Sequence, residues 1–119
     1  TIPFFFFFSG SKCYNIEEVA DQKVKTAFFK VGEVKIELLE ATSPESTIAK
    51  FIEKNNGRAG IHHVAFNVES VEEALKEAEA AGLQLIDKAP RKGAENLMIA
   101  FLHPKSTCGI LTELCEQPK

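Results

Sequence analysis

Three polar side chains of the sequence lie in apolar, strand-like stretches and could together bind a metal ion. They are one imidazole and two carboxylates: Glu37, His63 and Glu113. An ionised carboxylate on an otherwise apolar strand face is costly unless it is protonated, paired or metal-bound. One imidazole and two carboxylates suit a divalent ion such as zinc, cobalt, manganese or nickel, and open coordination positions would admit a substrate oxygen.

Each of these residues also has an ordinary structural interpretation. Glu113 could face solvent, His63 could be a hydrogen-bonded structural residue, and Glu37 could pair with Lys35. His62 is predicted to be a supporting or structural residue, because strand alternation sends it to the face opposite His63.

Basic residues in two polar loops could bind an anionic substrate. Arg91 lies in the loop at residues 90–93, and Lys105 lies in the loop at residues 103–106. Ordinary solvated charges are the alternative interpretation of both residues.

The first elements needed to position Glu37 form a predicted hairpin. Residues 24–31 and 34–40 are rich in β-branched and aromatic side chains, and Gly32 begins the turn between them. A helix is expected next, with Ser43 as its N-cap and its end at residues 55–57.

The second half is predicted to run strand–helix–strand–strand–strand. Its helix is expected to start at a capping box formed by Ser70 and Glu73 and to stop at Gly82. The four strand-like runs are residues 62–68, 83–86, 97–102 and 110–115.

The two halves contain an internal repeat. Residues 27–29 are similar to residues 100–102, and residues 36–40 are similar to residues 112–116, so that Glu113 matches Glu37 at an offset of 76 positions. Pseudo-symmetric strands that each present a glutamate can place both at one site, which favours a ligand pair over two unrelated surface charges.

The repeat also predicts which elements are missing. His63 precedes Glu113 by 50 positions, so its counterpart in the first module would lie before residue 1. The first module is therefore expected to lack its first strand and helix. Residues 1–12 include five consecutive phenylalanines, Phe4 to Phe8, and are interpreted as foreign to the domain, with a buried or edge strand as the alternative.

Composition limits the partners and the compartment. The 119 residues fit one domain, and a net charge of −3 argues against a nucleic-acid or anionic-membrane surface. Three cysteines without a Cys-x-x-Cys spacing favour reduced thiols in a cytosol-like compartment. No stretch of the sequence approaches the length of a transmembrane helix.

Four runs of the sequence resemble the methylmalonyl-CoA epimerases of the vicinal-oxygen-chelate superfamily. They are residues 36–51, 60–66, 101–106 and 109–114, within a resemblance that covers roughly residues 16–116. The resemblance implies an α+β fold of paired βαβββ modules around one divalent metal. It divides the single domain into a remnant of module 1 (13–42), a connecting helix and loop (43–60) and module 2 (61–117).

The resemblance also implies roles for individual residues. The family takes its metal ligands from a His on the first strand, which has no counterpart here, and from the positions of Glu37, His63 and Glu113. Some members carry a catalytic Glu where this chain has Thr26, so that base does not carry over.

The implied reaction interconverts (R)- and (S)-methylmalonyl-CoA by a 1,1-proton transfer through a metal-stabilised enolate. Glu113 is the candidate for one of the two proton-transfer roles. The expected partners are a small acyl-CoA substrate and a second copy of the chain in a homodimer. The expected compartment is the cytoplasm, or the mitochondrial matrix in a eukaryote. A glyoxalase-like metal-dependent lyase and a catalytically inactive chain that keeps the fold are the alternatives.

Overall fold

The computed structural model describes residues 12–116, so the Phe4–Phe8 run lies outside the described residues. The chain divides into two compact units, Thr1–Gly60 and Ile61–Lys119. Within residues 12–116, no helix is long and apolar enough to cross a membrane.

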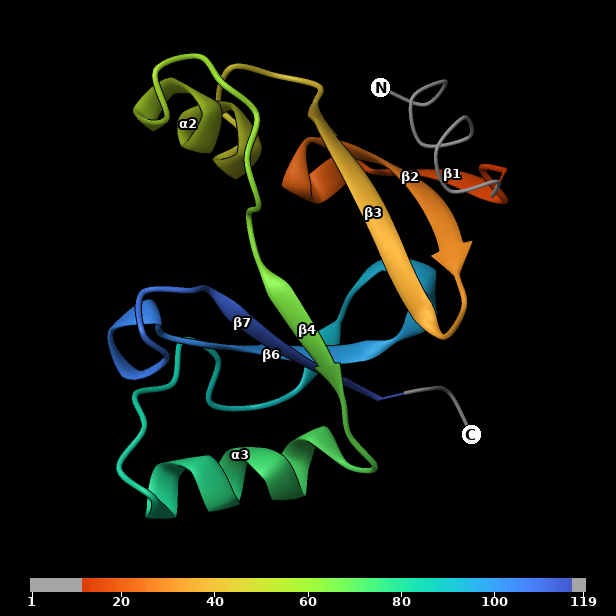
Figure 1. Ribbon diagram of the computed structural model, residues 1–119. Helices are drawn as coiled ribbons and strands as arrows, with labels where there is room; N and C mark the ends of the chain where they lie inside the picture. Colours follow the sequence, from red (N-terminus) through yellow and green to blue (C-terminus); the bar gives the residue numbers. More distant parts are fainter. Residues whose placement is uncertain (1–11, 117–119) are drawn as a thin grey trace. The chain divides into compact units, whose positions relative to one another are not determined.

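The first unit is built on a three-stranded antiparallel meander (Figure 1). Its strands are β1 (Asn15–Val19), β2 (Val24–Val31) and β3 (Val34–Ala41). The predicted hairpin of β2 and β3 is confirmed, because Val31 pairs with Val34 across a two-residue turn. Gly32 has a φ of 63° in that turn, a conformation that glycine adopts without the steric cost other residues incur.

Helix α2 (Thr47–Lys54) follows the meander, but it begins later than predicted. Its N-cap is Ser46, whose Oγ accepts a hydrogen bond from Ala49 N at 3.0 Å. Ser43 instead accepts from Glu45 N in a preceding turn, at 3.2 Å. Both serines satisfy local donors, and only Ser46 is followed directly by helical backbone.

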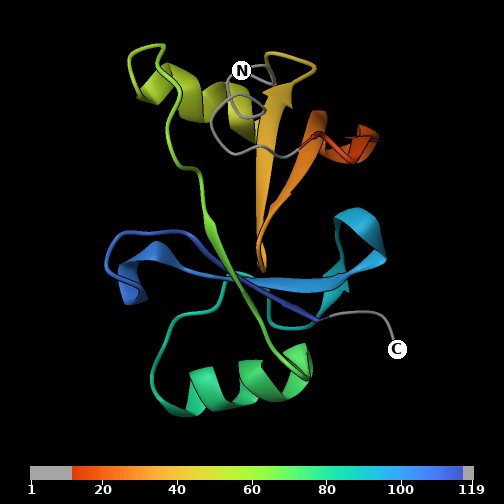
Figure 2. The same cartoon turned by 45° about the vertical axis from the view of Figure 1, so that its right-hand side comes forward.

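The second unit holds a four-stranded mixed sheet in the order β4-β7-β6-β5, and Figure 2 shows the same sheet from a second side. Strand β4 runs parallel to β7, whereas the β7–β6 and β6–β5 pairs are antiparallel. The strands are β4 (Val64–Asn67), β5 (Arg91–Lys92), β6 (Met98–Leu102) and β7 (Thr112–Glu116).

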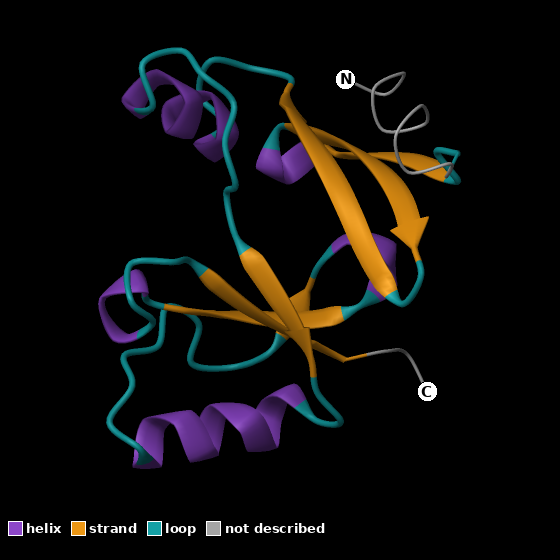
Figure 3. Cartoon of the chain, in the orientation of Figure 1, coloured by secondary structure: helices purple, strands orange, loops and turns teal. Residues whose placement is uncertain are grey.

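Helix α3 (Val71–Ala80) covers one face of this sheet (Figure 3). Its start is as predicted, because Ser70 Oγ accepts from Glu73 N at 3.2 Å. Apolar side chains of the helix pack on the even-numbered residues of the two central strands, and the buried cluster consists of Val71, Leu75, Ala78, Ala100, Leu102 and Leu114. Burying these side chains is the main force that holds α3 on the sheet.

One predicted strand and one predicted loop in this unit are wrong. Residues 83–86 do not form a strand, and only Leu85 makes an isolated bridge, to Leu102. The third strand is instead β5, inside the predicted loop at residues 90–93. Gly93 lets the chain approach β6 there, since a Cβ at this position would lie 2.7 Å from Ile99 Cδ1.

The strand registers agree with the internal repeat. Phe28 lies opposite Glu37 in the first unit, and Phe101 lies opposite Glu113 in the second. Within residues 12–60, no strand and helix correspond to β4 and α3. The predicted α+β class is confirmed, with two sheets and two α-helices among the described residues.

Candidate active site

Glu113 lies on the face of the second sheet that α3 does not cover. Its neighbour Leu114 packs on α3, and alternate residues of a strand point to opposite faces. The pairing partners of Glu113 are Ala65 on β4 and Phe101 on β6, so these three residues share the helix-free face.

His63 immediately precedes β4, and the structure places its ring against Glu113. His63 Nε2 lies 3.6 Å from Glu113 Oε1, and the two side chains are only 16% and 13% exposed. The His63 ring also meets the Phe101 ring edge-on, with centroids 5.5 Å apart. Two of the three predicted metal ligands therefore form one half-buried pair.

Burial keeps the imidazole of this pair neutral. Desolvation, with a smaller contribution from the nearby His62, lowers the pKa of His63 to about 4. At neutral pH the contact with Glu113 is therefore not a salt bridge. A neutral imidazole keeps a nitrogen lone pair, which is what a metal ion requires of a histidine ligand.

His62 contacts His63 directly, contrary to the expectation that the two rings diverge. Their Nδ1 atoms lie 2.9 Å apart, and the ring centroids lie 5.2 Å apart at right angles. Strand alternation does not apply, because β4 begins only at Val64. When His63 Nδ1 is the donor, its Nε2 carries the lone pair on the side of Glu113, so His62 can fix the tautomer that a metal ion would need.

Glu37 belongs to the other unit, where it is exposed on β3 opposite Phe28. Among the described residues, no three His, Cys, Asp or Glu side chains form a group that could hold a metal ion. The donors present in the second unit thus fit two coordination positions, His63 and Glu113. Thr26 is 2% exposed on β2 and carries a hydroxyl where the resemblance places a carboxylate base.

The two basic residues predicted to bind substrate differ in location: one lies on a strand and the other in an exposed loop. Arg91 is on β5 and pairs with Ile99, which shares a face of β6 with Phe101. Lys105 is exposed in the 3-10 turn η3 (Pro104–Ser106), in the loop between β6 and β7. Only Arg91 is placed by strand pairing on the face that carries Glu113.

Three interactions at Arg91, Asp87 and Phe101 were not predicted from the sequence. Asp87 Oδ1 accepts from Arg91 Nε at 3.0 Å, and its Oδ2 accepts from Phe101 N at 2.9 Å. The Arg91 guanidinium carbon also lies 5.5 Å from the centre of the Phe101 ring. No local pattern links Asp87 to Phe101, because β-bridging of distant segments brings them together.

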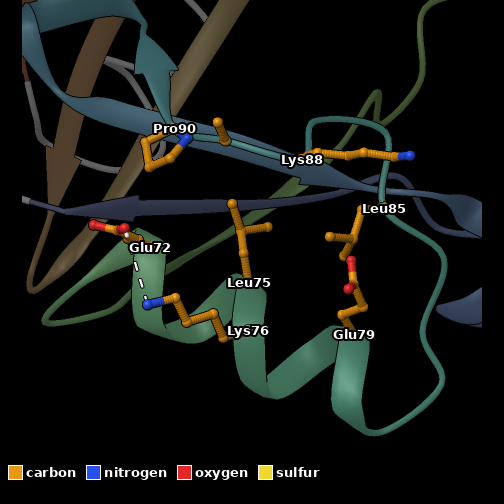
Figure 4. Close-up of a pocket in the computed structure, with 8 residues that line it drawn as sticks. Glu72, Leu75, Lys76, Glu79, Leu85, Lys88 and Pro90 are labelled. Carbon is orange, nitrogen blue, oxygen red and sulfur yellow. Dashed lines mark ion pairs between the residues drawn. The ribbon is translucent and has the colours of Figure 1, made fainter.

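A separate pocket of about 210 Å³ lies on the opposite, helix-covered side of the sheet (Figure 4). Its walls come from α3 and from the segment at residues 85–90, and they include Leu75, Lys88 and Pro90. Because α3 lines it, this pocket does not contain the His63–Glu113 pair.

A family model described as the Glyoxalase/Bleomycin resistance protein/Dioxygenase superfamily matches residues 5–101. The uncharacterized protein YqjC of Bacillus subtilis is 44% identical over 84% of this chain and 70% of that protein. An ethylmalonyl-CoA/methylmalonyl-CoA epimerase of Cereibacter sphaeroides is 36% identical over 82% of this chain and 73% of that protein. The chain spans only 56% of the mitochondrial methylmalonyl-CoA epimerase of Dictyostelium discoideum, to which it is 39% identical over 79% of its own length.

Solved structures agree with these relatives. A hypothetical protein from Bacillus halodurans is 46% identical, with a TM-score of 0.93 over 99% of this chain and 84% of that chain. A variant of the Streptomyces coelicolor methylmalonyl-CoA epimerase in complex with 2-nitronate-propionyl-CoA is 30% identical, with a TM-score of 0.88 over 98% of this chain and 83% of that chain. The chain therefore belongs to the Glyoxalase/Bleomycin resistance protein/Dioxygenase superfamily, and its relatives within it include methylmalonyl-CoA epimerases.

Proposed function

We propose that this chain is a metal-dependent epimerase that interconverts (R)- and (S)-methylmalonyl-CoA. The observation that carries the proposal is the half-buried pair of a neutral His63 and Glu113 on the helix-free sheet face. It gains support from the relatives and structural neighbours named methylmalonyl-CoA epimerase, one of which holds an acyl-CoA analogue.

The proposed metal ligands are His63, Glu113 and, from the resemblance, Glu37. Imidazole and carboxylate donors suit zinc, cobalt, manganese or nickel. When bound, a divalent cation would stabilise the negative charge that develops on the thioester oxygen as the α-proton leaves.

Glu113 is also the proposed group for one of the two proton transfers. Its carboxylate is largely shielded from water, and a carboxylate within reach of a bound α-carbon can act as a general base. Removing a proton from one face of the α-carbon and returning it to the other requires a second group. Thr26 lacks the carboxylate that the resemblance places there, so the second group is a different one.

The proposed substrate is anionic, and basic residues of the second unit could bind its negative charges. We assign Arg91 and Lys105 to binding its negative charges, with Arg91 on the sheet face that carries Glu113. The proposed assembly is a homodimer. The proposed compartment is the cytoplasm, or the mitochondrial matrix if the source is eukaryotic, as for the relative from Dictyostelium discoideum.

The test is exchange of the α-proton of methylmalonyl-CoA in D₂O, followed by mass spectrometry. Protein treated with EDTA and then given cobalt, zinc, manganese or nickel should catalyse exchange, and the EDTA-treated protein should not. Glu113→Gln should lower the rate by about 10²- to 10⁴-fold, the usual contribution of a proton-transfer residue. Glu116→Gln is the matched control, because Glu116 lies on the same strand but accepts a hydrogen bond from Val71 N on the helix side.

Two other outcomes would contradict the proposal. The superfamily match also covers glyoxalase-like lyases, so turnover of a hemithioacetal without exchange of methylmalonyl-CoA would favour that alternative. Thr26 in place of a carboxylate favours an inactive chain, and metal binding without turnover of either substrate would support it.

A further inference from the structure

Arg91 is held by two neighbours before any ligand arrives. Asp87 accepts from Arg91 Nε at 3.0 Å, and the guanidinium carbon lies 5.5 Å from the centre of the Phe101 ring. Ionic hydrogen bonding and cation–π contact together restrict a long side chain that would otherwise sample many rotamers. Asp87 is itself fixed, because its other oxygen accepts from Phe101 N at 2.9 Å.

The fixed guanidinium and the His63 ring both contact Phe101. Phe101 is the shared neighbour, since its ring centre is 5.5 Å from the Arg91 guanidinium carbon and 5.5 Å from the His63 ring centre. The guanidinium is therefore at most 11 Å from the His63 ring. Because Asp87 takes the Nε donor, the two terminal amino groups are the part of the fork left for a further acceptor.

We propose that Arg91 binds the free carboxylate of the malonyl group and that Asp87 is the positioning residue that orients the Arg91 guanidinium. This inference rests on the proposed function. A carboxylate with two oxygens matches a guanidinium fork, and the carboxylate is next to the reacting carbon. The phosphates of coenzyme A carry charge too, but the pantetheine arm separates them from the thioester. Arg91 then selects acyl-CoA substrates that carry a carboxylate over those that do not.

The test compares binding of malonyl-CoA and propionyl-CoA by isothermal titration calorimetry, using the metal-loaded full chain. Arg91→Gln should weaken malonyl-CoA binding by about ten- to a hundred-fold, the effect expected from losing a charge-assisted hydrogen bond, and change propionyl-CoA binding less than about two-fold. Lys92→Gln is the matched control: it removes the same charge from the adjacent, exposed residue and should change neither ligand.

Asp87→Asn tests the positioning role separately. It should raise KM for methylmalonyl-CoA while leaving kcat within about two-fold, as expected when ground state and transition state lose the same contact. Asp87→Glu should recover part of the loss. A purely structural role would instead lower the melting temperature and leave KM unchanged.

Three results would overturn this inference. Equal weakening of both acyl-CoA ligands by Arg91→Gln would show phosphate binding, and no weakening would show that Arg91 is not a ligand. A Lys92→Gln effect equal to that of Arg91→Gln would show general charge attraction. Selectivity for malonyl-CoA that depends on Arg91, in a chain that fails to exchange the α-proton, would instead support this inference and contradict the proposed epimerase reaction.

Discussion

At the residue scale, the surroundings of His63 determine its protonation state. Burial lowers its pKa and removes the charge that an exposed histidine would carry in mild acid. The same site brings Glu113 and His62 within 3.6 Å and 2.9 Å of the ring nitrogens. A ring that is neutral, oriented and beside a carboxylate has the form that the proposed metal would require of its ligand.

The lowered pKa predicts that the metal-free protein loses stability in mild acid. The unfolded chain takes up a proton on His63 near pH 6.5, whereas the folded chain does so only near pH 4. The unfolded state therefore binds more protons between these values, so the free energy of unfolding falls as the pH falls through this window. Between pH 7 and pH 5 the loss attributable to His63 is about 2 kcal/mol.

Urea unfolding in EDTA at pH 7 and pH 5 measures this loss. His63→Gln should remove about 2 kcal/mol of the pH-dependent change, because glutamine does not titrate. An equal loss of stability in wild type and His63→Gln would show that the ring is not buried in the neutral form.

At the element scale, local signals in the sequence predicted some elements and failed for others. The β2–β3 hairpin and α3 are specified by local residues: a glycine in the turn of the hairpin, and the Ser70 cap at the start of the helix. Strand β5 has only two residues, and its pairing with β6 depends on Gly93 fitting against Ile99. That contact is tertiary, so no pattern within residues 90–93 could reveal it.

Some features of the candidate site were likewise accessible from the sequence, and others were not. Glu113 was selected as a candidate from its apolar strand and its repeat partner Glu37, and the structure places it opposite Phe101 and beside His63. The contact between His62 and His63 could not be predicted from the sequence, because it depends on where β4 begins. The link from Asp87 to Phe101 was missed because it joins segments 14 residues apart in the sequence.

Packing of α3 on the sheet predicts a large effect of one core substitution. Leu75 is 3% exposed and belongs to the cluster that includes Leu102 and Leu114. Leu75→Ala should lower the free energy of unfolding by about 2–5 kcal/mol, since it removes buried methyl groups and leaves a cavity. Lys76→Ala on the exposed side of the same helix should change it by about 0.5 kcal/mol or less. Chemical denaturation of both variants measures the difference, and similar values would mean that α3 is not held by this core.

At the scale of the whole molecule, the internal repeat gives Glu37 and Glu113 equivalent positions. Each lies on the last strand of its sheet's hairpin, opposite a phenylalanine of the preceding strand. Repeat-related carboxylates with the same register are expected to have the same chemical role.

With this equivalence, the ligand set of the proposed function predicts that one metal ion per chain depends on both glutamates. Calorimetric titration with zinc or cobalt should give one ion per chain, and Glu37→Gln and Glu113→Gln should each weaken binding by at least about ten-fold. Glu40→Gln is the control on the same strand as Glu37, three residues further on and pointing to the other face. Binding to Glu37→Gln as tight as to Glu40→Gln would exclude Glu37 as a ligand.

The parallel pairing of β4 with β7 also has a consequence for the order of folding. In the first unit every strand pairs with its neighbour along the chain, whereas Val64 pairs with Thr112, 48 residues later. Closing so long a loop costs more chain entropy than closing a hairpin, so β4 is expected to join after α3 and the β6–β7 hairpin have formed. Because His63 immediately precedes β4, its contact with Glu113 is expected to form in this late step, and the proposed metal would find the pair assembled only in the fully folded unit.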